Sequence, residues 1–159
     1  MNKTKDIALT ALFIALTAVF TMIVRIPIPR ATGYINLGDA VVLIAAGMCG
    51  KKRGALCGGL GSAAADVLSG YPQWAVFTLV IKAVEGFLAG LGGKKTNPLF
   101  AVLSLIFMVA GYFVAGVILE GFVSSVASLG FNALQALVCG IIYFIAKNIL
   151  KRGRIWTKE

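Results

Sequence analysis

The sequence predicts an all-α integral membrane protein, folded as a compact bundle of six transmembrane helices with both termini in the cytoplasm. Of its 159 residues, 59% are hydrophobic and 13% are charged, whereas soluble domains carry about 25% charged residues. The mean hydropathy is +0.92. Six apolar segments follow one another, and basic residues gather in alternate connections between them. We expect one membrane domain over residues 1–159.

Each helix is expected where an apolar segment approaches the length of about 20 residues that crosses a bilayer. The first segment follows Lys3 and Lys5 as in a signal peptide, but no small-residue cleavage site precedes Arg25, so we expect a retained span. The third segment is rich in glycine and alanine, which let membrane helices pack closely. The predicted helices are residues 5–26, 39–50, 54–69, 75–93, 98–119 and 123–150.

The positions of Lys and Arg predict the orientation, because cytoplasmic loops of membrane proteins are enriched in both. If all six segments cross, 12 of the 15 basic residues fall on the side of the termini. Arg25 and Arg30 fall on the other side, and Lys82 lies within a span. The net charge of +9 is therefore attributed to topology and lipid contact, with no nucleic acid partner. The twelve residues are Lys3, Lys5, Lys51, Lys52, Arg53, Lys94, Lys95, Lys147, Lys151, Arg152, Arg154 and Lys158.

Two opposite charges, Lys82 and Glu85, interrupt the apolar segment FTLVIKAVEGFLAG. A charge at membrane depth costs about 2.5–3.5 kcal/mol on insertion scales, so such residues usually face a cavity or one another. Residues three apart share a helix face. Two interpretations stay open: a mutual ion pair, or a pair that also contacts a ligand.

Other polar residues fall at a similar depth when positions are counted at 1.5 Å per residue. Tyr112, Asn132 and Gln135 lie in the same outer half of the membrane, near an aromatic end that includes Trp74. This distribution predicts a ligand pocket open to the outside, since an ion pathway would need polar groups through the whole thickness.

Two acidic residues lie at predicted helix ends. Asp39 stands at a helix start, where we interpret it as a cap that suits the helix dipole. For Asp66, near the outer end of the third helix, a structural and a functional role both stay open.

Catalytic and metal sites are not expected. The chain has no histidine, which removes the commonest general base and metal ligand. Cys49, Cys57 and Cys139 lack metal-binding spacing and are interpreted as packing residues. The stretch LAGLGGKK departs from the phosphate-loop pattern at Leu88 and Lys95. We expect neither a metal nor a cofactor, and any ATP must be used by partner subunits.

The first helix carries a stripe of small residues, Ala8, Ala11, Ala15 and Ala18, within ALTALFIALTAVF. Small residues let membrane helices approach closely. The stripe suits either docking of another membrane protein or close packing inside the bundle.

Several stretches resemble the substrate-binding S components of energy-coupling factor (ECF) transporters, which take up vitamins in prokaryotes. They are the alanine stripe, GYINLGDAVVLIAAG, and GALCGGLGSAAADVLSGYPQWAVFTLVIKAVEGFLAG, followed by the basic end. The similarity covers about residues 7–95 and is greatest to the group of riboflavin, hydroxymethylpyrimidine and pyridoxine carriers.

The resemblance implies a protein of the prokaryotic cell membrane that binds a vitamin near its outer face, beneath the loop RIPIPRATGYINLGD. It implies docking through Ala11 and Ala15 on a transmembrane coupling subunit that carries two ATPase subunits. It also implies a ligand region at matching positions, to which the depth argument adds Tyr112, Asn132 and Gln135. The matching positions are Tyr34, Asn36, Trp74, Thr78, Lys82 and Glu85.

Three other classes compete with this interpretation. A stand-alone secondary transporter driven by protonation of Glu85 would need a route to the inner face or internal repeats. A membrane enzyme lacks a nucleophile and base at suitable spacing. A purely structural membrane subunit would bind no vitamin.

Overall fold

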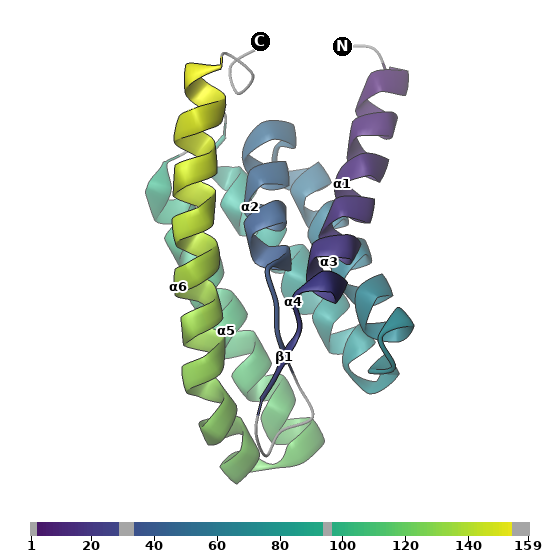
Figure 1. Cartoon of the computed structure of the whole chain (residues 1–159), viewed down its shortest axis with the longest axis vertical. Coiled ribbons are helices and arrows are strands. Elements are labelled where there is room, and N and C mark those ends of the chain that lie inside the picture. The colour runs from purple at the N-terminus through teal and green to yellow at the C-terminus, as the bar shows by residue number, and fades with distance from the viewer. Residues whose placement is uncertain (1–2, 29–33, 94–96, 154–159) are drawn as a thin grey trace.

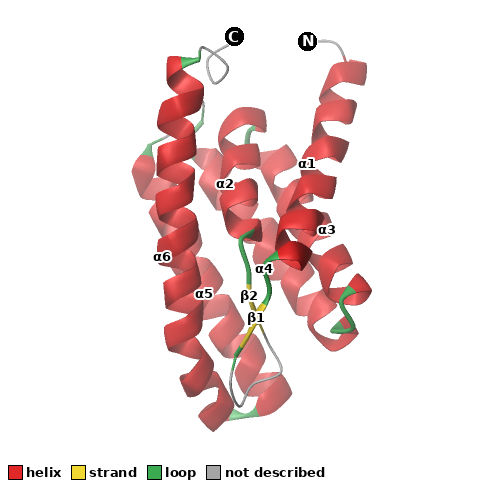
Figure 2. Ribbon diagram, viewed as in Figure 1, coloured by secondary structure: helices red, strands yellow, loops and turns green. Residues whose placement is uncertain are grey.

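The computed structural model describes residues 3–28, 34–93 and 97–153 and confirms the prediction of an all-α fold with six helices (Figure 2). Two short strands, β1 and β2, pair antiparallel between the first two helices, with Ile26 opposite Ile35. The elements are α1 Lys3–Ile23, β1 Ile26–Pro27, β2 Tyr34–Ile35, α2 Gly38–Cys49, α3 Lys51–Leu68, α4 Pro72–Leu91, α5 Pro98–Glu120 and α6 Phe122–Arg152.

Proline and glycine explain where several helices begin and end. α1 ends at Ile23, earlier than expected, and the chain is already extended at Ile26, since a residue before proline disfavours helix. α4 starts at Pro72, which suits the first helical turn because its missing N–H is not needed there. Gly50, with φ of 83°, separates α2 from α3 in a conformation that favours glycine.

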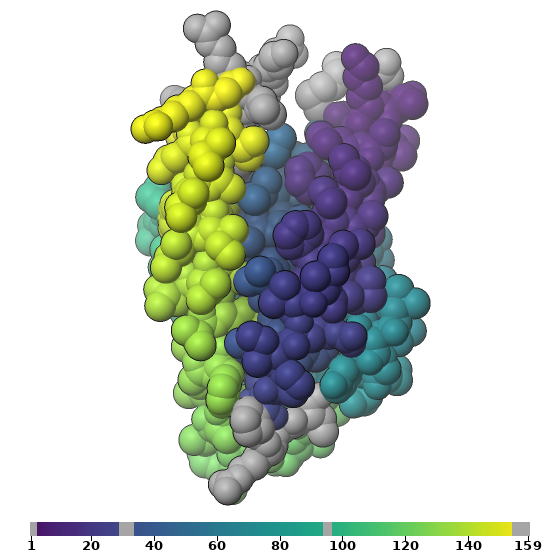
Figure 3. Space-filling model, viewed as in Figure 1, coloured from purple at the N-terminus to yellow at the C-terminus, as the bar shows by residue number. Residues whose placement is uncertain are grey.

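Four helices of the described chain, α1, α4, α5 and α6, are long and apolar enough to cross a membrane. α2 is apolar but has only 12 residues, and α3 has 18 residues and is the least apolar of the six. Both short helices are central: α2 contacts α1, α3, α4 and α6, while α3 contacts α1, α2 and α4. On the face drawn in Figure 3, α2 is visible between α6 and α1.

The bundle has two different ends (Figure 1). The start of α1 and the end of α6 lie together at one end, and the β1–β2 hairpin lies toward the other. A salt bridge of 2.9 Å between Arg53 and Asp6 joins the start of α3 to the start of α1. The loop RIPIPRATGYINLGD, which is expected to cover the vitamin, includes this hairpin, but residues 29–33 of the loop lie outside the described residues.

Glycines bring α3 and α4 into backbone contact. A Cβ atom added at Gly86 would lie 2.2 Å from the carbonyl oxygen of Gly54, and one at Gly58 would lie 2.4 Å from that of Lys82. Real side chains do not approach so closely, so larger residues at these positions would separate the helices. This packing places the Lys82 backbone directly against α3.

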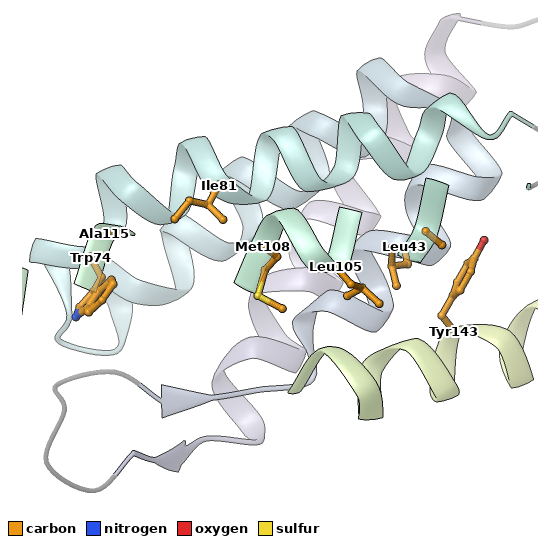
Figure 4. Packing of buried hydrophobic residues seen from close by; sticks show 8 residues of the cluster. Leu43, Trp74, Ile81, Leu105, Met108, Ala115 and Tyr143 are labelled. Carbon is orange, nitrogen blue, oxygen red and sulfur yellow. The ribbon is translucent and has the colours of Figure 1, made fainter. Parts of the chain in front are cut away.

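The largest apolar cluster runs along the bundle between α2, α4, α5 and α6 (Figure 4). Trp74 and Tyr143 lie at its opposite ends, with Met108 fully buried between them. Cys57 and Cys139 are also fully buried and have free thiols. The apolar interior therefore reaches Trp74, where the polar site begins.

We predict that Gly86→Ala destabilises the protein by about 1–3 kcal/mol, because the new methyl group forces α3 and α4 apart. Thermal unfolding of the purified protein would measure the loss. Gly130→Ala is the matched control, since this helical glycine in α6 has open space at its Cβ position. Equal stability of the two variants would contradict the close α3–α4 contact.

Candidate ligand-binding site

A cavity of about 40 Å³ lies beneath the hairpin. Its walls come from the hairpin, α3, α4, α5 and α6. Seven of the nine ligand residues predicted from the sequence line it, and Lys82 and Glu85 are not among its lining residues. The lining residues are Ile28, Tyr34, Asn36, Asp66, Trp74, Thr78, Tyr112, Glu120, Ser128, Asn132 and Gln135.

Three aromatic residues, Tyr34, Trp74 and Tyr112, line this cavity. The ring centroids of Trp74 and Tyr112 lie 6.0 Å apart, and those of Tyr34 and Tyr71 lie 5.1 Å apart. The Tyr112 hydroxyl donates a hydrogen bond to Oγ1 of Thr78 over 3.2 Å. Such rings offer flat faces on which a heteroaromatic ligand can stack.

A hydrogen bond ties the hairpin to α3. The Tyr34 hydroxyl donates to Oδ1 of Asp66 over 2.6 Å. The phenol is the donor of this bond, because a carboxylate oxygen only accepts.

A second contact ties the hairpin to α6. The backbone N–H of Asn36 donates to Oε1 of Gln135 over 2.7 Å, and the Asn36 side chain accepts from the N–H of Gly38 over 2.8 Å. Nε2 of Gln135 then donates to Oδ2 of Asp39 over 2.8 Å. Gln135 thus joins the cavity wall to a buried charge cluster deeper in the bundle.

The charge cluster consists of Lys82, Asp39 and Glu85, whose side chains are at most 1% exposed. Lys82 donates to Oδ1 of Asp39 and, over 2.8 Å, to Oε2 of Glu85. Its ammonium also lies 5.4 Å from the centre of the Tyr112 ring. The interpretation of Lys82 and Glu85 as a mutual pair is therefore correct in part, because a third residue joins them.

The interpretation of Asp39 as a helix cap is wrong. Leu37 occupies the capping position of α2, without a side-chain cap, and Asp39 is fully buried inside the first turn. Its carboxylate turns toward α4 and α6 because Lys82 and Gln135 both donate to it. Sequence position alone gave no signal for these partners, which stand 43 and 96 residues away.

Two further features bear on partners. Ala8, Ala11 and Ala15 are exposed on α1. Within the described residues, no group of three or more His, Cys, Asp or Glu side chains is arranged to hold a metal ion.

A small helical membrane protein with a polar and aromatic cavity at one end belongs to the class of membrane-embedded binding proteins. The family model described as "ECF-type riboflavin transporter, S component" matches residues 1–152. The chain belongs to this family of ECF transporter S components, as its sequence predicts. It is therefore a component of a membrane transporter rather than an enzyme.

Two relatives agree with this assignment. An uncharacterized protein of Pyrococcus woesei is 46% identical over 129 residues, covering 78% of this chain and 86% of that protein. The thiamine precursor transporter HmpT of Lactococcus lactis subsp. cremoris (strain MG1363) is 33% identical over 152 residues, covering 95% of this chain and 90% of that protein. The family and the similarity to HmpT support transport of a vitamin or a vitamin precursor.

We predict that Lys82→Met destabilises the protein by about 3–5 kcal/mol, because Asp39 and Glu85 lose the cation that they share inside the bundle. Thermal unfolding in detergent would measure this loss. Adding Asp39→Asn and Glu85→Gln should restore part of it. As a control, Arg53→Gln breaks a partly exposed ion pair and should cost about 1 kcal/mol or less. A Lys82→Met protein as stable as the wild type would contradict a structural role for the cluster.

Proposed function

We propose that the protein binds a small water-soluble vitamin or precursor with high affinity at the outer face of a prokaryotic cell membrane. The ligand types are those of the sequence prediction: pyridoxine, hydroxymethylpyrimidine or riboflavin. ATP hydrolysis by partner subunits drives uptake, and this chain uses no cofactor of its own. The observation that carries the proposal is the cavity, where aromatic faces and hydrogen-bonding groups converge beneath the hairpin.

The proposed orientation places all six helices across the membrane and both termini in the cytoplasm. Lys3, Lys5 and residues 51–53 lie near one another at one end, joined by the Arg53–Asp6 salt bridge. Enrichment of basic residues marks the cytoplasmic side, so the cavity faces outward. Five further basic residues used in the prediction lie outside the described residues: Arg30, Lys94, Lys95, Arg154 and Lys158.

Helix α2 is too short to span the bilayer alone. Its 12 residues reach about 18 Å of the roughly 30 Å hydrocarbon thickness. In the proposed arrangement the extended strand β2 completes this crossing. The polar backbone of the hairpin is then shielded by the contacts of Tyr34 with α3 and of Asn36 with α6.

The size of the cavity favours a single-ring ligand over a flavin. Its volume of about 40 Å³ is well below the roughly 300 Å³ at which small-molecule sites usually begin. Even a single ring therefore requires the cavity to widen. The similarity to HmpT, described as a thiamine precursor transporter, supports the same choice.

In this proposal Lys82 and Glu85 lie beneath the ligand and hold residues that line the cavity. Lys82 lies against the Tyr112 ring, and Asp39 of the same cluster accepts from Gln135. Both Tyr112 and Gln135 line the cavity. Loss of either charge would therefore shift cavity walls and weaken vitamin binding.

The partner in the proposal is an ECF transmembrane coupling subunit that carries two ATPase subunits. Ala8, Ala11 and Ala15 form an exposed small-residue stripe on α1, in the half of the helix that begins at Lys3. Small residues suit close approach of another membrane helix. Exposure of the stripe favours docking over packing inside the bundle.

The alternative of a stand-alone transporter would use protonation of Glu85. This carboxylate is fully buried, and its Oε2 accepts a hydrogen bond from Lys82. Proton exchange would have to break the charge cluster in every cycle. Vitamin uptake by vesicles that contain this chain alone would support the alternative.

We predict that a binding vitamin changes the fluorescence of Trp74, which lines the cavity. Replacing Trp156 by Phe leaves Trp74 as the only tryptophan of the chain. Pyridoxine, hydroxymethylpyrimidine and riboflavin would be titrated separately, with calorimetry as a second measurement. Trp74→Ala should weaken binding roughly tenfold or more through loss of a stacking face. If no vitamin binds, and none is released from gently purified protein, the proposed function fails.

We predict that Ala11→Leu with Ala15→Leu abolishes ATP-dependent uptake but leaves vitamin affinity unchanged, because bulky side chains keep the coupling subunit away. The measurement is uptake into vesicles that contain the whole transporter, beside calorimetry on the isolated chain. Ala127→Leu is the control, since it enlarges an exposed alanine near the start of α6. Normal uptake by the double variant would exclude this docking surface.

A further inference from the structure

We propose that Asp66 selects the ligand: its Oδ2 atom accepts a hydrogen bond from a small heteroaromatic molecule that carries an amine or hydroxyl group bonded directly to its ring. This inference rests on the proposed function, because it assumes that the cavity is the vitamin site. It adds the chemical feature by which the site would recognise its ligand.

The two oxygen atoms of Asp66 have different surroundings. The side chain lines the cavity and is only 5% exposed. Oδ1 accepts from the Tyr34 hydroxyl over 2.6 Å, whereas Oδ2 is buried and has no hydrogen-bond partner among the described residues. Thr78 also interacts with this carboxylate, but it makes no hydrogen bond to Oδ2. A buried acceptor without a donor is costly, so a ligand that supplies one is strongly favoured.

The other buried acids do not present an unpaired acceptor oxygen to the cavity. Asp39 has partners on both oxygens, from Lys82 and Gln135. Glu85 also has one oxygen without a partner, but its other oxygen is bonded to Lys82 and the residue does not line the cavity. Asp66 forms no ion pair with the described residues. Its acceptor therefore combines burial, negative charge and access to the cavity.

The surroundings of Asp66 define the rest of the ligand. Trp74 and Tyr112 provide aromatic faces for a planar ring. Asn132 and Gln135 lie on the wall formed by α6 and supply amide groups. A ring stacked on the aromatic side would present its edge substituents to these polar groups. An aminopyrimidine would offer an amine to Asp66, and pyridoxine would offer a hydroxyl.

Selectivity follows from the cost of an unpaired carboxylate. A compound of the same shape that lacks the donor would bury Oδ2 without a partner. Sites built to hydrogen-bond a substrate group reject analogues without it far more strongly than apolar pockets reject a missing methyl. Hydrogen bonds to charged groups correspond to roughly a tenfold to hundredfold change in affinity.

Calorimetry with matched ligand pairs would test the inference. One pair is hydroxymethylpyrimidine and its analogue with a methyl group in place of the amine. The other pair is pyridoxine and its analogue without the ring hydroxyl. In the wild type, we expect one of the two pairs to show selectivity. Within that recognised pair, the compound that lacks the donor should bind roughly tenfold to hundredfold more weakly than its parent. The pair that shows this loss distinguishes an amine from a hydroxyl ligand.

The variant Asp66→Asn should bind the parent ligand more weakly and lose most of the difference within the recognised pair. An amide has an oxygen at one position and an NH2 donor at the other, so when the oxygen accepts from Tyr34 the ligand's donor faces another donor. Asp6→Asn is the matched control, because Asp6 lies at the opposite end of the bundle, paired with Arg53. It should behave as the wild type.

The outcomes separate the two proposals. If the wild type binds none of the parent vitamins, the proposed function fails. If it binds one of them but does not distinguish the members of either pair, only the assignment to Asp66 fails. Unchanged affinity and selectivity in Asp66→Asn would also overturn the assignment. Should that variant not fold, the matched pairs on the wild type still decide whether a ligand donor is recognised.

Discussion

Lys82 bonds to two carboxylates inside a bundle that has little polarity around them, and the arrangement of the site depends on it. Asp39 comes from α2, and Lys82 and Glu85 come from α4. Gln135 adds α6 through its bond to Asp39. Because uncompensated charges are strongly unfavourable in an apolar interior, these three helices can pack together only in the register that joins the groups. That register also sets the distance between the cavity walls.

Close glycine contacts and the charge cluster both involve α4. Gly54 and Gly58 let α3 approach the backbone of α4 near Gly86 and Lys82. The opposite side of α4 then faces α2 and α5, so Lys82 reaches Asp39 while Thr78, one turn earlier, reaches Tyr112. Backbone packing on one face of α4 therefore positions both the buried charges and part of the cavity.

The hairpin is attached to the bundle mainly through two polar contacts. Tyr34 bonds to Asp66 of α3, and the backbone of Asn36 bonds to Gln135 of α6. Both partners line the cavity, so a ligand that engages either of them would also affect how the hairpin is held. This gives the proposed binding site a direct physical link to the hairpin. The exposed alanines of α1 lie in a different part of the protein, which allows binding and docking to be tested separately.

The sequence by itself determined the membrane class, the six helices and the family, because apolar length, glycine content and motif order are local properties of the chain. It also identified seven residues of the cavity, three from their depth along the helices and four from the resemblance to the family. It could not identify the role of Asp39 or the two unequal oxygens of Asp66. Those depend on side chains that arrive from distant helices, and only tertiary packing decides whether a buried carboxylate meets a lysine, a phenol or an open cavity.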